Sequence, residues 1–404
     1  MYEELIRELS DTQVFWTSLD EIKQNFSANT VILWFMMIFS VIGGIDKVRG
    51  NKWGYGEKFD EAFATLKPMA LAMIGVLTLV PVISLILEPL ISPVYQLFGA
   101  SPAMFAGTMF AVDAGAYPLA MELAGADTAI GSFSGIVLGS TFGGFILGMI
   151  PISLEILEEK DRKTFAAAVL VAIVTVPLGC IAGGLVMKAV GYDMTLGKLI
   201  VNLIPVIIVA ALVALGLWLR PETVMNGFCV LGRAMQAVLV FGIVVSSFQA
   251  VTGLRLPLFY LMVESSQPGG VSPLTDSLII VGNIGLILTG AFPMILWISR
   301  TFQKPIQRLG KWLGMNEAAA TGLLAALANY FPALNLVSQM NLKGKLLFLA
   351  FAMAASFVFG DHLGFTAGVD QGMVVPLVVA KLVAGVTALL LANAIAPKLI
   401  GNEE

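Results

Sequence analysis

The chain has 404 residues, of which 58% are hydrophobic and only 12% are charged. Soluble globular domains carry roughly 25% charged residues, so this composition excludes an ordinary soluble protein and predicts an all-α polytopic membrane protein. The formal net charge is only −4 and no basic patch with interleaved aromatic residues occurs, which excludes nucleic acid as a partner.

The first residues, MYEELIRELSDTQVFW, are acidic and lack the apolar core of a signal peptide. We interpret residues 1–28 as an amphipathic surface extension and residues 29–404 as a transmembrane transport domain. Continuous apolar runs such as residues 71–87 favour spanning helices over the short alternating segments of a β-barrel. About nine full spans are predicted, near residues 30–45, 68–87, 132–154, 165–187, 199–219, 227–250, 277–299, 346–360 and 374–396.

Two further apolar stretches are interrupted in the middle. Residues 101–121 contain Asp113 beside glycine and proline, and residues 316–334 contain Asn329 shortly before a proline. Proline removes a backbone donor and glycine permits unusual backbone angles, so both stretches are predicted to be broken or re-entrant helices.

The loop charges support two re-entrant segments. Loops that follow the spans near 30–45, 132–154 and 277–299 are rich in lysine and arginine, whereas loops 88–100 and 253–275 hold only Arg255 between them. Cytoplasmic loops are enriched in these residues. The loops rich in lysine and arginine all fall on the cytoplasmic side only if both broken segments turn back within the membrane. This arrangement predicts an outer N-terminus and an inner C-terminus.

The two broken segments then enter from opposite faces, and each is followed by a span rich in small residues at an offset of about 215 residues. This pattern predicts weak inverted repeats at about residues 101–190 and 316–396. Inverted repeats with discontinuous helices that meet near the midplane are typical of transporters. Closely spaced glycines, as in SGIVLGSTFGG, indicate close helix packing and favour a homo-oligomer.

Ionisable residues within apolar sequence are the candidates for chemistry. Asp113 lies inside the first broken segment, and Asp361 adjoins His362, the one histidine of the chain. A surface helix cap would explain Asp113, and an interface turn would explain Asp361, but intramembrane ionisable residues are functional by default. His362 is either a packed structural residue or a group that binds substrate or responds to pH. Glu122 is a further candidate, although a solvated helix end explains it more simply.

Aromatic residues flank the polar breaks, namely Tyr117, Tyr330 and Phe331. An aromatic ring beside a carboxylate holds a cation through charge attraction and the ring quadrupole, worth roughly 0.5–2 kcal/mol per contact. Ordinary helix packing is the alternative explanation for these rings. The residues suit a small cation or a neutral polar amine.

The catalytic alternatives lack their motifs. An intramembrane aspartyl protease would carry glycine two residues before its catalytic Gly-Asp pair, where this chain has Val358. A single histidine excludes multi-histidine metal sites, GSFSG has Phe133 where a nucleophile elbow has serine, and no phosphate-binding loop occurs. Cys180 and Cys229 lie in apolar segments and imply no disulfide framework. We therefore expect a non-enzymatic carrier or channel without metal or cofactor.

The chain also resembles the ethanolamine permeases of ethanolamine-utilisation operons, the EutH family. The similarity runs from about residue 30 to the C-terminus, so the extension 1–28 precedes it. The motifs that carry it are SPAMFAGTMFAVDAGAY at 101–117, IVTVPLGCIAGGL at 173–185, the apolar segment at 203–217, GAFPMILWISR at 290–300, LAALANYFP at 324–332 and FGDHLGF at 359–365.

The resemblance implies uptake of ethanolamine across the bacterial cytoplasmic membrane. It implies that Asp113 or Asp361 binds the ammonium group, with Tyr117, Asn329 or Phe331 around the hydroxyethyl group. A pathway-facing Tyr330 would shift the preference toward a bulkier amine. Facilitated diffusion, proton symport and sodium symport all stay open, as does a carrier for another small amine or polar solute. An intramembrane protease is the remote alternative.

Overall fold

The computed structural model describes residues 11–265 and 269–399, and the regular elements of these residues are all helical. Seven continuous helices among them are long and apolar enough to cross a membrane, which confirms the polytopic helical fold. These helices are α3 (Ala28–Val48), α4 (Tyr55–Gln96), α9 (Arg162–Ala189), α10 (Leu196–Leu219), α11 (Pro221–Thr252), α12 (Pro273–Trp312) and α17 (Val374–Leu399).

The predicted spans at 132–154 and 346–360 are interrupted rather than continuous α-helices. The first consists of α7 (Thr128–Ser132), the π-helical stretches η2 (Phe133–Gly143) and η3 (Phe145–Met149), and α8 (Ile150–Ile156). The second consists of α15 (Leu342–Ala355), an irregular turn, and α16 (Asp361–Val369). π-Helical turns occur frequently at functional sites, so the interruptions direct attention to this part of the fold.

The two segments predicted to be broken are indeed broken in the middle. In the first, Gly115 adopts φ 94° between the single turn that holds Asp113 and the following helix, a conformation that favours glycine. In the second, Asn329 adopts extended backbone angles, and its Oδ1 accepts a hydrogen bond from the amide of Phe331 at 3.1 Å. The pieces are α5 (Ala103–Met109), η1 (Val112–Ala114), α6 (Ala116–Ala124), α13 (Glu317–Ala328), α14 (Tyr330–Leu334) and η6 (Val337–Gln339).

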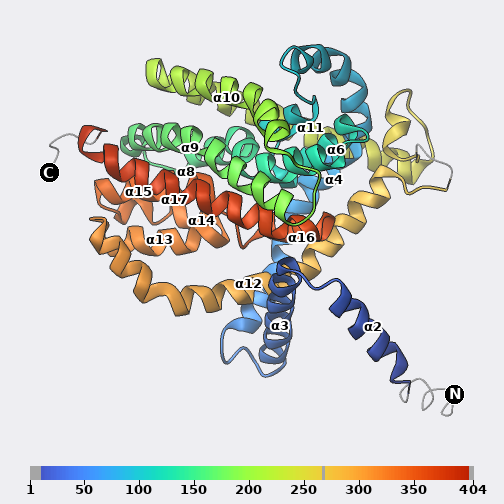
Figure 1. Ribbon diagram of the computed structural model, residues 1–404, viewed down its shortest axis with the longest axis horizontal. Helices are drawn as coiled ribbons and strands as arrows, with labels where there is room; N and C mark the ends of the chain where they lie inside the picture. The colour runs from blue at the N-terminus through green and yellow to red at the C-terminus, as the bar shows by residue number, and fades with distance from the viewer. Residues whose placement is uncertain (1–10, 266–268, 400–404) are drawn as a thin grey trace.

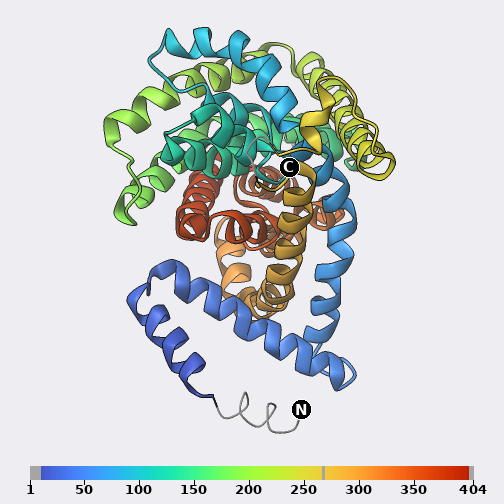
Figure 2. The same ribbon diagram turned by 90° about the vertical axis from the view of Figure 1, so that its right-hand side faces the viewer.

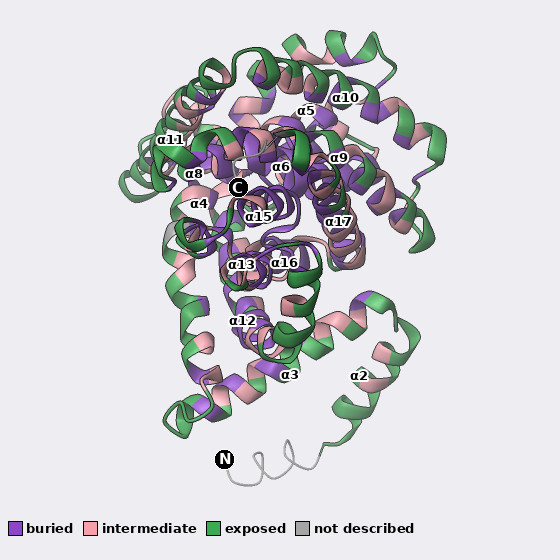
Figure 3. Ribbon diagram, turned by 90° about the vertical axis from the view of Figure 1, so that its left-hand side faces the viewer, coloured by how far each residue is buried: buried purple, intermediate pink, exposed green. Residues whose placement is uncertain are grey.

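Long helices pack in pairs around these broken segments. Helix α4 packs against α12, and α9 packs against α17. At the second contact Gly179 and Gly183 face Ala384 and Ala380, because only small residues allow two backbones to approach so closely. Buried residues concentrate in α13, α15 and α16 at the centre, whereas α10 and α11 are largely exposed on the outside (Figure 3).

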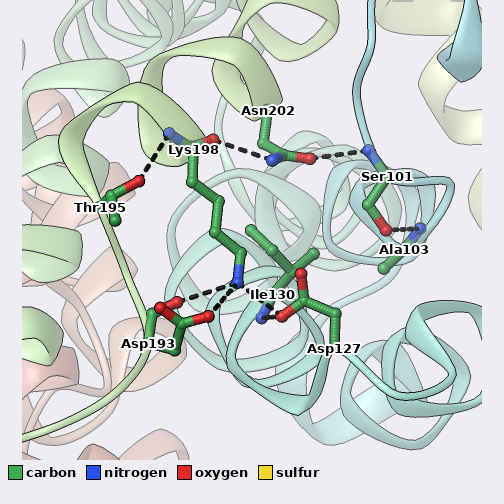
Figure 4. Close-up of polar contacts among 8 residues, drawn as sticks. All are labelled: Ser101, Ala103, Asp127, Ile130, Asp193, Thr195, Lys198 and Asn202. Carbon is green, nitrogen blue, oxygen red and sulfur yellow. Dashed lines mark hydrogen bonds and ion pairs between the residues drawn. The ribbon is translucent and has the colours of Figure 1, made fainter.

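Helix α10 holds both ends of the first broken segment (Figure 4). At the start of the broken segment, the side-chain oxygen of Asn202 accepts a hydrogen bond from the amide of Ser101 at 2.7 Å. Just after the end of the broken segment, Lys198 donates to Asp127 at 2.8 Å, and Asp127 in turn caps α7 by accepting from the amide of Ile130. Both ends of the first broken segment are therefore fixed to α10.

The second broken segment is tied at its ends to the residues on either side of it. Asn316 donates to the carbonyl of Gln339 at 2.8 Å, and the side chain of Asn341 bonds both the amide of Asn316 and the carbonyl of Gly314. Gln307 of α12 donates to Glu317 at the start of α13 at 3.1 Å, so a neighbouring spanning helix holds this segment too.

The N-terminal helix α2 (Gln13–Gln24) has no buried residue and extends away from the rest of the molecule (Figures 1 and 2). Its Val14, Phe15 and Trp16 are exposed, and residues 1–10 of the predicted extension lie outside the described residues. The short helices η4 (Glu159–Asp161), η5 (Phe259–Met262) and η7 (Gln371–Met373) complete the described elements.

Candidate functional site

A large cavity begins at the broken helices and runs to the ends of α8, α9 and α11 on the lysine-rich side. Its volume is about 1180 Å³. Asp113 and Asp361 both line its deep end, together with the side chains of Asn329, Phe331 and Phe357. On the predicted topology this cavity opens toward the cytoplasm. Its wide end is lined by both negatively and positively charged side chains, namely Glu155, Glu159, Arg162, Lys163, Glu222 and Arg233.

The irregular turn before α16 positions Asp361. The amides of Phe357 and Phe359 donate to the carbonyls of Ala326 and Leu327 at the end of α13, both at 3.0 Å. These bonds satisfy backbone groups that lipid cannot solvate. Asp361 is the first residue of α16, where the positive end of the helix dipole stabilises a carboxylate, and its Oδ1 accepts from the amide of His362.

Phe357 has a strained backbone, with φ at 61°. A bulky residue rarely adopts a positive φ, and such conformations cost of order 1–3 kcal/mol, so they cluster at functional sites. The ring of Phe357 lies 5.5 Å from that of Phe331 and 5.1 Å from that of His362, measured between centroids. The two phenylalanines form an aromatic wall beside Asp361.

Asp113 is held by close contact between its turn and the π-helical stretch η2. The amide of Gly107 donates to the hydroxyl of Ser134, and that hydroxyl donates to the carbonyl of Ala103. Farther along η2, a side chain at Gly143 would overlap the carbonyl oxygen of Phe110. The glycines of η2 thus allow its backbone to pack closely against the turn that contains Asp113, because they have no side chain to prevent it.

Gly143→Ala is therefore expected to destabilise the protein by about 2 kcal/mol, a typical overpacking cost, and to reduce transport by displacing the Asp113 turn. Gly227→Ala in α11 is the matched control, because a methyl group there meets no atom within 4 Å. Thermal unfolding in detergent and uptake assays on both variants check this. Equal behaviour of the two variants would refute the role given to Gly143.

A buried lysine lies behind the two aspartates. Lys381 in α17 is fully buried, and its ammonium donates to the carbonyl of Ser140 in η2. Ser140 follows Gly139, where a side chain would come within 3.3 Å of the amide of Val112, so the ammonium group lies close to the turn that holds Asp113. The sequence showed Lys381 as a single cation inside PLVVAKLVAGV, yet it was not among the predicted site residues. Phe357 was missed as well, because a phenylalanine in an apolar run carries no signal of its own.

The structure brings four of the eight candidate residues to the cavity, namely Asp113, Asn329, Phe331 and Asp361. The other four lie elsewhere. Tyr330 is fully buried and its hydroxyl pairs with that of Ser153 at 2.8 Å, and Tyr117 packs edge-on against Phe365. His362 is buried against Phe357, and Glu122 is exposed near the end of α6.

Polar contacts hold the C-terminal end of α16, which lies opposite the cavity. Asp370 accepts hydrogen bonds from the hydroxyls of Tyr192 at 2.6 Å and Ser132 at 3.0 Å. Burial raises the pKa of Tyr192 well above its usual range, and the bond to Asp370 and its charge raise it further. The hydroxyl therefore stays protonated and keeps donating at physiological pH. We call Ser132, Tyr192 and Asp370 the outer closure.

Comparisons with known proteins agree over most of the chain. A family model described as "Ethanolamine utilisation protein, EutH" matches residues 28–395. A protein of Listeria monocytogenes named "Probable ethanolamine permease EutH" is 44% identical over 90% of this chain and 92% of its own length. A protein of Escherichia coli with the same name is 40% identical over 92% and 96%. "Uncharacterized protein YxeR" of Bacillus subtilis is 37% identical over 90% and 93%. No solved structure matches significantly.

Proposed function

The chain belongs to the EutH family of ethanolamine utilisation proteins, and from this we propose that it is a permease that carries protonated ethanolamine across the bacterial inner membrane. It is an integral multi-pass membrane protein and not an enzyme, so the protease alternative falls.

The observation that supports this best is the deep end of the cavity, where two carboxylates meet an amide and an aromatic wall. Asp361 and Asp113 would attract the ammonium group of the substrate, and the faces of Phe331 and Phe357 would add a cation–π contribution. The amide of Asn329 can both donate to and accept from the hydroxyl group. A small hydroxy-amine presents these two groups at its two ends.

The order of the helices supports a proposal of inverted repeats. Helices α4, α5–α6, α7–α8 and α9 are followed, about 215 residues later, by α12, α13–α14, α15–α16 and α17 in the same order. On the predicted topology the two sets run in opposite directions. Transport would then alternate between the observed cavity and an opening at the outer closure, with both aspartates at the point where the sets meet.

The outer closure yields a first prediction about this alternation. Tyr192→Phe removes one hydrogen bond to a partly buried carboxylate, worth about 1 kcal/mol, and should shift the ratio of the two conformations about fivefold away from the observed one. Cys229 lines the cavity and is a natural reporter, since Cys180 is buried. We expect slower labelling of Cys229 by an impermeant thiol reagent from the inner side. Tyr260→Phe, at an exposed tyrosine, should leave labelling unchanged, and an unchanged rate in Tyr192→Phe would refute the closure.

The proposed function is tested by labelled ethanolamine uptake into proteoliposomes at pH about 6 under an inside-negative potential. We expect saturable uptake that is absent from protein-free liposomes. Ethylamine, which lacks the hydroxyl, should compete less well than ethanolamine itself because Asn329 would lose its partner. Saturable uptake of another small amine in preference to ethanolamine would overturn the substrate assignment, and no saturable uptake of any amine would overturn the function.

A further inference from the structure

We propose that Lys381 is a fixed internal counter-ion that leaves the binding site with one net negative charge, so that one monovalent ammonium substrate neutralises it without sodium or a proton. This inference rests on the proposed function and selects among the coupling modes that it permits.

The placement of Lys381 comes from its contacts. Its ammonium donates to the carbonyl of Ser140 in the π-helical stretch η2. On one side of Ser140, a side chain at Gly139 would come within 3.3 Å of the amide of Val112, the residue before Asp113. On the other side, Gly144 faces the ring of His362, the residue after Asp361. The ammonium therefore lies at the point where both aspartate-bearing breaks meet η2.

Lys381 does not form part of the cavity surface. Asp113 and Asp361 line the cavity, and Lys381 is fully buried behind them. No ion pair within 4.0 Å joins it to either carboxylate among the described residues, so its attraction acts on both at longer range. The carboxylate oxygens that face the cavity stay free to contact a substrate, while Lys381 offsets one of their two charges.

The other ionisable groups near Lys381 do not change the net charge of the site. His362 of α16 is buried, and its Nδ1 has no partner among the described residues. Cys180 of α9 pairs with the hydroxyl of Thr141, and Asp370 next to η7 is held in the outer closure. Lys345 of α15 is paired with Asp161. The cluster thus comprises two carboxylates, Asp113 and Asp361, and one ammonium group, Lys381.

Charge balance gives the mechanistic consequence. A buried site with uncompensated charge is strongly disfavoured in a low-dielectric interior. With Lys381 present, one ammonium substrate makes the loaded site neutral. Backbone carbonyls beside carboxylates can coordinate a coupling sodium ion in transporters. Here the carbonyl of Ser140 accepts a hydrogen bond from the ammonium of Lys381, which takes the place that the inference would otherwise assign to a sodium ion.

The test compares wild type with Lys381→Gln in proteoliposomes and in binding experiments. For wild type we expect one charge per ethanolamine from the reversal potential, no effect of replacing sodium by potassium, and a flat KM between pH 6 and 8. The substrate amine itself stays protonated over this range, because such amines titrate near the pKa of lysine, about 10.4.

Lys381→Gln leaves two buried carboxylates without a counter-ion, so they should share a proton while the site is empty, and the ammonium group of ethanolamine should displace that proton. The KM should then rise up to about tenfold per unit decrease in pH, the limit for one linked proton, and the outgoing proton should cancel the charge that moves with each ethanolamine. Calorimetric titration in two buffers of different ionisation enthalpy should count one proton released on binding, against none in wild type. This second measurement does not require transport.

Three further variants complete the design. Lys381→Arg keeps the charge and should behave as wild type in charge ratio and pH profile. The double variant Asp361→Asn, Lys381→Gln restores one net negative charge, and at substrate concentrations high enough to offset the weaker binding expected without Asp361 it should return to one charge and no proton per ethanolamine. Lys398→Gln, at an exposed lysine of the same helix, is the matched control.

A structural role alone predicts something different. Lys381→Gln would then lower protein yield or activity but keep one charge and a flat pH profile, and that result would overturn the inference. Sodium-dependent uptake by wild type would overturn it as well. If wild type shows no saturable ethanolamine uptake at all, the proposed function fails first, so the two failures are distinguishable.

Discussion

Replacing Asp361 with asparagine is expected to raise the KM for ethanolamine uptake about 100-fold or to abolish uptake. An ion pair at about 4 Å contributes about 4 kcal/mol at an effective dielectric constant of about 20, before desolvation costs. Each tenfold change in affinity corresponds to about 1.4 kcal/mol, so loss of most of this attraction accounts for the expected factor. Asp113→Asn should act in the same direction, because both carboxylates line the deep end of the cavity.

The control for these variants is Glu122→Gln. Glu122 was the least favoured candidate in the sequence, and the structure leaves it exposed near the end of α6. Its replacement removes the same charge from the same broken segment as Asp113 without touching the cavity, and should leave KM unchanged. Uptake that survives in both aspartate variants but fails in Glu122→Gln would show that the site lies elsewhere.

The second large effect concerns stability. Lys345 of α15 and Asp161 at the start of α9 form a buried ion pair at 2.6 Å, with side chains only 9% and 5% exposed. Removal of one partner of such a pair strands a buried charge and costs about 3–5 kcal/mol. We expect Lys345→Met to lower the midpoint of thermal unfolding in detergent strongly.

Two further variants separate the effect of a stranded buried charge from the effect of losing a lysine. Lys160→Met breaks an exposed pair with Glu158 in the same loop and should change the midpoint little. The double variant Lys345→Met, Asp161→Leu replaces both charges by apolar groups and should recover most of the stability. A double variant as unstable as Lys345→Met would show that packing, and not the stranded charge, is responsible.

The fold was largely predictable because lipid imposes a strong pattern on sequence. Hydropathy located the spanning segments, since each helix must bury its backbone in about 20 apolar residues. The breaks at Asp113 and Asn329 were predictable from polar residues beside glycine or proline. The π-helical stretch in the span at 132–154 was not, because it leaves the overall hydropathy unchanged. Gly360 and Gly364 indicated a helix break beside Asp361, but nothing in the apolar sequence before them indicated that α15 ends at Ala355.

The site was predictable in part. Asp113 and Asp361 were found because charge within an apolar run is costly, and the structure places both on one cavity. Tyr330 was not separable from Phe331 by sequence, since neighbouring helical residues point about 100° apart and nothing in the pattern says which faces inward. Phe357 reaches the cavity only through a positive φ that no local residue preference predicts. Lys381 carried the same signal as the aspartates, a charge within an apolar run.

The position of α10 has a consequence for how such a chain can arise by gene duplication. On the predicted topology, the chain crosses the membrane four times from α3 to α9 and so returns to the side from which it started. A second copy joined directly to the first would therefore have the same orientation. Helix α10 adds one crossing before the second set begins at α11, and an odd total reverses that set. On the proposed inverted repeats, the helix without a counterpart would be the one that makes the two halves antiparallel, and it is also the helix that binds the first broken segment through Lys198 and Asn202.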